Sequence, residues 1–94
     1  MENYQFKDDV LCVQQIRKCE LAYFYHRTPV TFRKEIESIF IKTAFKHYYS
    51  SSEVEKIFAH LGPVTVADVE NAKERIAAYY KTLRDRYKAK HLIK

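Results

Sequence analysis

The stretch ELAYFYHRTPVTFRKEI, residues 20–36, decides the fold. Thr28-Pro29 marks the start of a helix, because the threonine side chain accepts a hydrogen bond from a free N–H of the first turn and proline at the first helical position loses no bond. Ala22 is a small residue in the apolar segment before this start, and Phe32 follows it by ten residues. This spacing predicts two short helices that cross where Ala22 meets Phe32, with a tight turn at 25–28.

The predicted pair of helices resembles a helix-turn-helix over about residues 19–37. The start of the second helix of such a motif enters the major groove of DNA, where Arg33 or Lys34 can donate to guanine or to phosphate. Two positions depart from the usual pattern, because His26 stands where glycine is common and Arg27 where an apolar residue is common. The backbone at His26 must therefore avoid or tolerate a left-handed conformation. The residues expected to face outward are Thr28, Val30, Thr31, Arg33, Lys34 and Glu37.

The segment before this motif shows apolar residues that recur on one face. Asp8 or Asp9 is expected to cap a helix that begins near Val10. The pattern leaves two alternatives open: one helix to about Tyr25, or two short helices with a break near Lys18.

The segment after the motif carries a second start signal. The helix that opens at Thr28-Pro29 is expected to reach about residue 47, with or without a kink. Ser50 and Glu53 then form a capping box, in which each side chain satisfies the backbone N–H of the other residue. The apolar spacing that follows predicts a helix over about 51–61, ended by the single glycine of the chain.

A third start signal introduces a long C-terminal helix. Thr65 and Asp68 repeat the capping box and predict a helix over about 66–90. Its apolar stripe alternates steps of three and four residues, as in a heptad seam. At 1.5 Å per residue this helix would measure about 37 Å, so either its basic end projects into solvent or a second copy pairs with it. The stripe consists of Val69, Ala72, Ile76, Tyr80, Leu83 and Tyr87.

Two motifs taken together resemble a known group of proteins. The first is ELA..Y..T..TFR from Glu20, and the second is Y-S-x-x-E-V-x-x-I-F-x-x-L-G from Tyr49. The combination is similar to the small helix-turn-helix proteins of Bacteroidetes genomes and their mobile elements, which are like excisionase-like and MerR-like DNA-binding heads. The resemblance covers about residues 19–63. It implies that 29–37 form a recognition helix and 51–61 a supporting helix.

Composition and charge narrow the classes of function. Apolar residues make up 47% of the chain, which is typical of a globular protein. The net charge is +5, and residues 81–94 hold six basic side chains against one acidic one, so the excess lies in the tail. This distribution favours a polyanionic partner, although a solvated helix end gives the same pattern. The sequence shows neither a membrane-spanning run nor a signal peptide, so we expect a cytoplasmic protein with reduced cysteines.

Catalysis and metal binding are not expected. A single glycine excludes a glycine-rich phosphate loop, and no Ser–His–Asp or Cys–His pairing can be identified from spacing. Cys12, Cys19 and His26 recur at intervals of seven residues, which is about 10 Å along a helix and too far to share one metal ion. We therefore expect no enzymatic activity, no cofactor and no small-molecule substrate.

The sequence thus predicts an all-α fold with four or five helices in one domain over residues 1–94. The predicted function is sequence-specific binding of double-stranded DNA, as a transcriptional regulator or a mobile-element accessory factor, with a homodimer through the C-terminal helix as an open option. Two alternatives stay open: a helical protein–protein interaction module without nucleic-acid binding, and RNA binding through the basic tail and exposed tyrosines. The predicted DNA-binding residues are Arg27, Thr28, Val30, Thr31, Arg33, Lys34, Glu37, Lys42 and Lys46.

Overall fold

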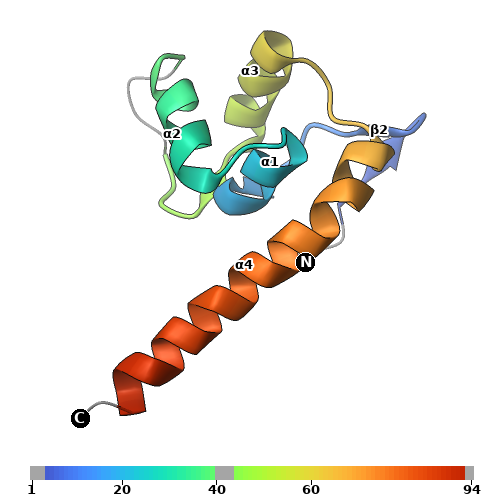
Figure 1. Ribbon diagram of the computed structural model, residues 1–94. Helices are drawn as coiled ribbons and strands as arrows, with labels where there is room; N and C mark the ends of the chain where they lie inside the picture. The colour runs from blue at the N-terminus through green and yellow to red at the C-terminus, as the bar shows by residue number, and fades with distance from the viewer. Residues whose placement is uncertain (1–3, 40–43, 93–94) are drawn as a thin grey trace.

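Three short helices gather beside the first half of a long fourth helix in the computed structural model, which describes residues 4–39 and 44–92 (Figure 1). The second half of the long helix extends past the other elements, and the C-terminus lies at its far tip. The described helices are α1 (Lys18–Phe24), α2 (Pro29–Glu37), α3 (Ser51–Leu61) and α4 (Val66–Leu92). None of them combines the length and the apolar character needed to cross a membrane.

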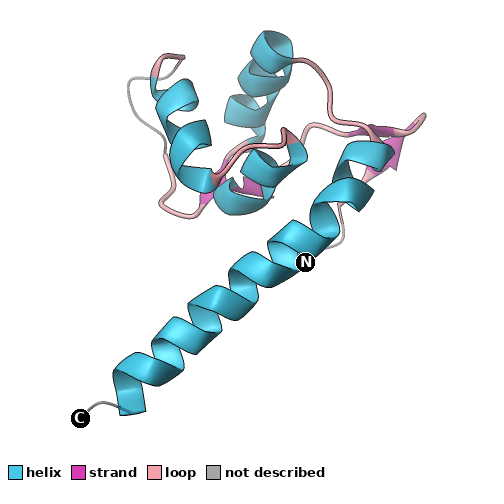
Figure 2. Ribbon diagram, viewed as in Figure 1, coloured by secondary structure: helices cyan, strands magenta, loops and turns pink. Residues whose placement is uncertain are grey.

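Two small antiparallel sheets accompany the helices, so the fold is mostly helical and the all-α prediction is wrong in this respect (Figure 2). The first sheet is a hairpin of β1 (Phe6–Lys7) and β2 (Val10–Leu11). The second joins segments far apart in the sequence, because β3 (Ile16–Arg17) pairs with β4 (Tyr48–Tyr49).

The hairpin replaces the helix that was predicted to begin near Val10. Asp8 and Asp9 have φ values of 51° and 62°, so both adopt the left-handed conformation of a tight hairpin turn and neither caps a helix. The segment before α4 then extends this sheet: the Leu11 N–H donates to the Val64 carbonyl at 2.8 Å, and the Val66 N–H donates to the Asp9 carbonyl at 2.9 Å. The first helix begins only at Lys18, so both predicted alternatives are wrong for the residues between Val10 and Lys18.

The second helix is also shorter than predicted, because α2 ends at Glu37 and not near residue 47. The segment after residue 43 is held by other partners. The Ala44 N–H donates to Oε2 of Glu53 at 3.1 Å, and the His47 carbonyl accepts from the Lys18 N–H at 2.9 Å. These bonds take the segment into β4, where it pairs with β3, and away from a helical path.

The two predicted capping boxes are confirmed. The Ser50 N–H donates to the Glu53 carboxylate at 2.8 Å, and the Glu53 N–H donates to Oγ of Ser50 at 3.3 Å. The Thr65 N–H donates to Asp68 at 2.9 Å, and the Asp68 N–H donates to Oγ1 of Thr65 at 3.2 Å. Both α3 and α4 therefore begin where the sequence placed them.

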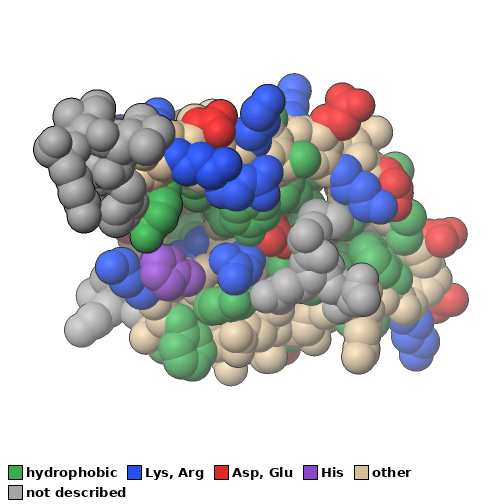
Figure 3. All heavy atoms as spheres, turned by 90° about the horizontal axis from the view of Figure 1, so that it is seen from below, with side chains coloured by type: hydrophobic (Ala, Val, Ile, Leu, Met, Phe, Trp, Pro, Cys, Tyr) green, Lys and Arg blue, Asp and Glu red, His purple; other side chains and the backbone are tan. Residues whose placement is uncertain are grey.

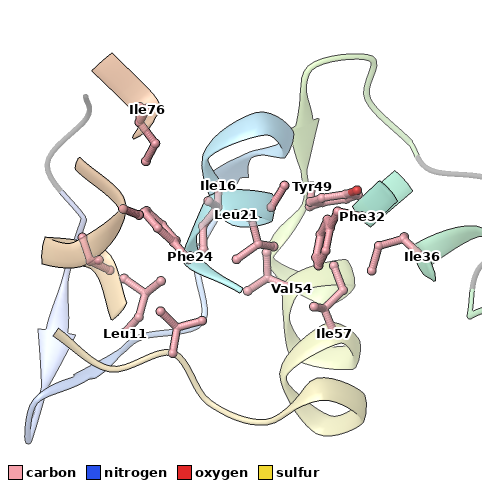
Figure 4. Packing of buried hydrophobic residues seen from close by; sticks show 14 residues of the cluster. Leu11, Ile16, Leu21, Phe24, Phe32, Ile36, Tyr49, Val54, Ile57 and Ile76 are labelled. Atoms are coloured by element: carbon pink, nitrogen blue, oxygen red, sulfur yellow. The ribbon is translucent and has the colours of Figure 1, made fainter. Parts of the chain in front are cut away.

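The buried apolar residues form one cluster, shown in Figure 4. Phe32 of α2 and Ile57 of α3 lie at one end of it, Leu21 of α1 lies in the middle, and Ile76 of α4 lies at the other end. Burying side chains of this size stabilises the fold by roughly 1.5–3 kcal/mol each. Helix α1 contacts both α2 and α4 and contributes the middle of this cluster.

Helix α4 leaves this core half-way along its length. Ile76 is buried, whereas Leu83 and Tyr87 on the same stripe are 41% and 66% exposed. Within the described part of the chain, the basic end of α4 thus projects beyond the core.

Candidate nucleic-acid interface

The turn between α1 and α2 is closed by two backbone hydrogen bonds. The His26 N–H donates to the Tyr23 carbonyl at 2.9 Å, and the Arg27 N–H donates to the Ala22 carbonyl at 3.0 Å. This pair of bonds is a Schellman motif, which ends a helix at a left-handed residue. His26 fills that position with φ of 61°, so it tolerates the conformation that glycine usually adopts there. Ala22 and Phe32, the two residues expected to meet at the crossing, are both 0% exposed.

Side-chain contacts fasten the turn to the later helices. The Tyr25 hydroxyl donates to the Gly62 carbonyl at 2.6 Å, which ties the turn to the end of α3. Its ring stacks on Phe32 at 5.6 Å between centroids. His26 lies 3.4 Å from Asp68, which caps the start of α4. The orientation of α2 is therefore fixed by α1, α3 and α4 together.

Arg27 has an internal role in this turn. Its guanidinium donates to the Tyr25 carbonyl at 2.6 Å and forms an ion pair with Glu35 of α2. The side chain is about one-third exposed, so the arginine bridges the two helices of the motif. The phosphate contact predicted for Arg27 stays a prediction.

The start of α2 presents the predicted recognition residues to solvent. Val30, Arg33, Lys34 and Glu37 are spaced i, i+3, i+4 and i+7, so they share one helix face. All four are exposed, and the buried pair Phe32 and Ile36 lies on the opposite side.

The first turn of α2 is held by threonines. Oγ1 of Thr28 accepts from the Thr31 N–H at 3.3 Å and donates to Oγ1 of Thr31 at 3.0 Å. The predicted role of Thr28 as the N-terminal cap of α2 is therefore confirmed. Both threonines are exposed beside the face of α2 that carries Arg33 and Lys34. Further along α2, Arg33 is 69% exposed and its Nε lies 3.9 Å from Glu37, a loose pair that leaves the guanidinium able to turn toward a ligand.

The last two predicted residues belong to the segment between α2 and β4. Lys46 is exposed and lies near Arg33, since both line the same groove. Lys42 lies outside the described residues.

That groove of about 620 Å³ separates the start of α2 from the middle of α4. Figure 3 shows a hollow containing hydrophobic side chains, with lysine, arginine and histidine side chains around it. Its basic lining is Arg17, Lys18, Arg33, Lys46 and His47, and its apolar and aromatic lining includes Pro29, Val30, Tyr49, Tyr79, Tyr80 and Leu83.

Sequence reasoning missed Arg17 and Lys18 as members of this surface. The Arg17 guanidinium lies over the Tyr48 ring at 5.2 Å, and the Lys18 ammonium over the Tyr49 ring at 5.3 Å. Both cations reach the groove because β3 pairs with β4 across 31 positions, from Arg17 to Tyr48. A local pattern contains no signal for such a pairing.

The charges in the groove influence one another. Burial lowers the pKa of Lys18 below its usual value, and the nearby Arg33 lowers it further, while Glu53 acts in the opposite direction. Burial also raises the pKa of Tyr49 to about 12, so this tyrosine is neutral at physiological pH.

A buried carboxylate anchors the α4 wall of the groove. Glu20 of α1 is 1% exposed and accepts from the Tyr80 hydroxyl at 2.5 Å and from the Tyr4 hydroxyl at 2.8 Å. Sγ of Cys19 lies 3.4 Å from the same Tyr80 hydroxyl. Burial, followed by these bonds to Cys19 and Glu20, raises the pKa of Tyr80 well above its usual value. Tyr80 is therefore a neutral donor that holds α4 against α1.

The projecting half of α4 adds a second cationic surface. Four exposed basic side chains lie there against Asp85, namely Lys81, Arg84, Arg86 and Lys88. Among the residues that the structure describes, no cluster of three or more His, Cys, Asp or Glu side chains could hold a metal ion.

The chain matches no protein-family model, and no significant match was found among curated proteins or solved structures.

Proposed function

We propose that this protein binds double-stranded DNA with α2 as its recognition helix. The observation that carries the proposal is the exposed, cationic start of α2, which stands on a turn fixed by three other helices. An α-helix with its side chains is about 10–12 Å in diameter, so α2 can enter the major groove, which is about 12 Å wide.

The recognition face offers different contacts to a base-pair edge. Arg33 can donate two N–H groups to the O6 and N7 acceptors of guanine, and Lys34 can donate to guanine or to phosphate. Val30 can pack against a thymine methyl group, and Glu37 can accept from the amino group of cytosine or release Arg33 from its loose pair.

The projecting half of α4 would contact phosphates on the neighbouring backbone. Four exposed cations against one carboxylate give this segment an excess positive charge. Each phosphate neutralised adds about 0.9 to the magnitude of the log–log salt slope of binding. A protein that uses both surfaces would therefore bind duplex DNA with a steep dependence on salt.

The test compares two matched charge reversals in duplex gel shifts over a range of salt concentrations. Arg33→Glu with Lys34→Glu removes two contacts of the recognition face, and the expected loss of affinity is at least about 30-fold. The control is Lys56→Glu with Lys73→Glu, which makes the same change of charge at exposed positions on α3 and α4. Equal losses for both pairs would reject α2 as the recognition helix. If the losses differ as expected, selection of sites from random duplex DNA would identify the preferred sequence.

A second candidate function rests on the exposed apolar residues of α4. Leu83 and Tyr87 continue the core stripe but lie open to solvent, so they could pack against another helix. Pairing of two copies in a DNA-binding dimer would bring like charges of the α4 ends together, so added salt should strengthen it. Sedimentation equilibrium tests this: a dimer that Leu83→Asp with Tyr87→Asp dissociates would support pairing through α4. A dimer unaffected by this change would exclude it.

The biological setting that we propose follows from the resemblance of the motifs at Glu20 and Tyr49. Transcriptional control and an accessory role in excision of a mobile element both require a small duplex-binding protein. Mapping the selected sites onto promoters or onto element ends would distinguish the two settings.

A further inference from the structure

The groove between α2 and α4 has a chemistry that the outward face of α2 does not require. Four lysine and arginine side chains line it: Arg17, Lys18, Arg33 and Lys46. No carboxylate belongs to the described lining, although Glu20 bonds to Tyr80 of the α4 wall, and Glu37 and Glu53 lie near Arg33 and Lys18. The groove is therefore complementary to an anion.

The positions of the cations point to one shared anionic group. Lys18 is at the start of α1 and Arg33 on α2, yet both line this groove, and the charge of Arg33 contributes to the lowered pKa of Lys18. Pro29 and Val30 bring the N-terminal end of α2 to the same wall, and this end of a helix dipole is positive. An anion between these groups would be attracted by each of them.

The opposite wall is suited to a flat, apolar group. Tyr79 and Tyr80 of α4 line it together with Leu83. The centroid of the Tyr79 ring lies 5.8 Å from that of Tyr23 and 5.9 Å from that of Tyr80, so the position of this ring is fixed by other aromatic rings. The volume of about 620 Å³ lies within the range of about 300–1,000 Å³ that small-molecule sites occupy.

We propose that this groove binds a nucleoside phosphate, with the phosphate between Lys18, Arg33 and Lys46 and the base against Tyr79. A planar base supplies the ring contact that the carboxylate of an acidic peptide lacks. The ligand is either a free nucleotide or one unpaired nucleotide of a DNA strand, since both present the same groups. The inference stands apart from duplex binding, although Val30 and Arg33 are common to both surfaces.

The test follows backbone amide signals of the whole chain by NMR during three titrations. The probes are 5′-AMP, inorganic phosphate and a single-stranded oligomer of six deoxyadenylates. We expect 5′-AMP to shift the amides of Cys19, Val30 and Leu83, which line the groove, at concentrations where phosphate alone does not. Tighter binding of the oligomer than of 5′-AMP would identify a DNA strand as the source, and equal or weaker binding would identify the free nucleotide.

Matched variants separate the groove from the recognition face. Tyr79→Leu should weaken binding of 5′-AMP by about 5- to 100-fold, whereas Tyr79→Phe keeps the ring and should bind as the parent does. Lys18→Gln should weaken it by about fivefold, and Lys34→Gln, on the outward face, should leave it unchanged. Duplex gel shifts with Lys18→Gln and Lys34→Gln report separately on α2.

Three results would overturn the inference. Inorganic phosphate could bind as tightly as 5′-AMP, which would remove the base from the interaction. The groove amides could fail to shift with either nucleotide probe. Lys34→Gln could weaken binding of 5′-AMP as much as Lys18→Gln does, which would place the ligand on the outward face.

Discussion

Replacing Glu20 with glutamine should loosen the attachment of α4 to α1. The Glu20 carboxylate is buried and accepts hydroxyl bonds from Tyr4 and Tyr80. Glutamine keeps the volume, but its NH₂ group cannot accept, so one hydroxyl loses its partner and the other gains a neutral acceptor. Hydrogen bonds to charged groups contribute about 1.5–3 kcal/mol and neutral ones about half of that, so the expected loss of unfolding free energy is roughly 2–4.5 kcal/mol. In a chain of this length that is a fall in Tm of about 10–35 °C.

Urea unfolding followed by ellipticity at 222 nm measures this loss, and a double-mutant cycle with Tyr80→Phe assigns it. The expected coupling between the two changes is about 1–2 kcal/mol, because each removes one end of the same bond. Tyr79→Phe is the matched control on the adjacent residue and should change stability by less than about 0.5 kcal/mol. Additive losses for Glu20→Gln and Tyr80→Phe would refute the anchoring role of this bond.

Three further changes test a helix end, a helix cap and a buried strand residue. Gly62→Ala should lower the free energy of unfolding by about 1–2 kcal/mol, as measured by thermal unfolding. The loss comes from backbone strain at φ of 94° alone, because an added Cβ would meet no atom within 4 Å. An unchanged Tm would contradict this prediction. Asp68→Asn should lower the free energy of unfolding by about 1 kcal/mol and make it depend less on pH under acidic conditions. Hydrogen bonds from Thr65 lower the pKa of Asp68 below 3.8, so the stabilisation by this carboxylate is present above that pH and is lost as the pH falls further. Urea titrations at pH 2–6 measure this change. Burial raises the pKa of Tyr49 from 10.0 to about 12, so its contribution is complete below pH 10 and lost as pH rises through 12; Tyr49→Phe should remove this part of the alkaline loss in ellipticity.

Helix starts could be predicted because capping is a local interaction. Each of three predicted helices begins at a cap that the sequence identified, namely Thr28, Ser50 or Thr65. The capping side chain and the N–H that it accepts from lie within three residues of each other, so a short stretch of sequence is enough to recognise them. Acidic residues before an apolar run are less informative. Asp8 and Asp9 suit a helix cap and a tight hairpin turn equally, and only pairing of the hairpin with the segment before α4 decides between them.

The remainder of the fold depends on contacts between distant residues. Apolar spacing alone extended α2 toward residue 47, but the bond from Ala44 to Glu53 and the pairing of β3 with β4 direct that segment elsewhere. The same pairing brings Arg17 to the groove, and the bond between Glu20 and Tyr80 brings α4 there. The exposed face of α2 was predictable from helical periodicity, whereas the groove beside it was not.

Helix α4 is held to the core at one end and extends beyond it, so a small rotation at the attachment point moves the far end by a larger distance. Tyr80 is its last residue bonded to Glu20, and the backbone continues to Leu92, about 18 Å further at 1.5 Å per residue. A tilt of about 10° at this fulcrum would displace the far tip by about 3 Å, close to the spacing of successive base pairs along B-DNA. In the DNA complex that we propose, small adjustments near Glu20 would therefore change which phosphates the end of α4 can reach.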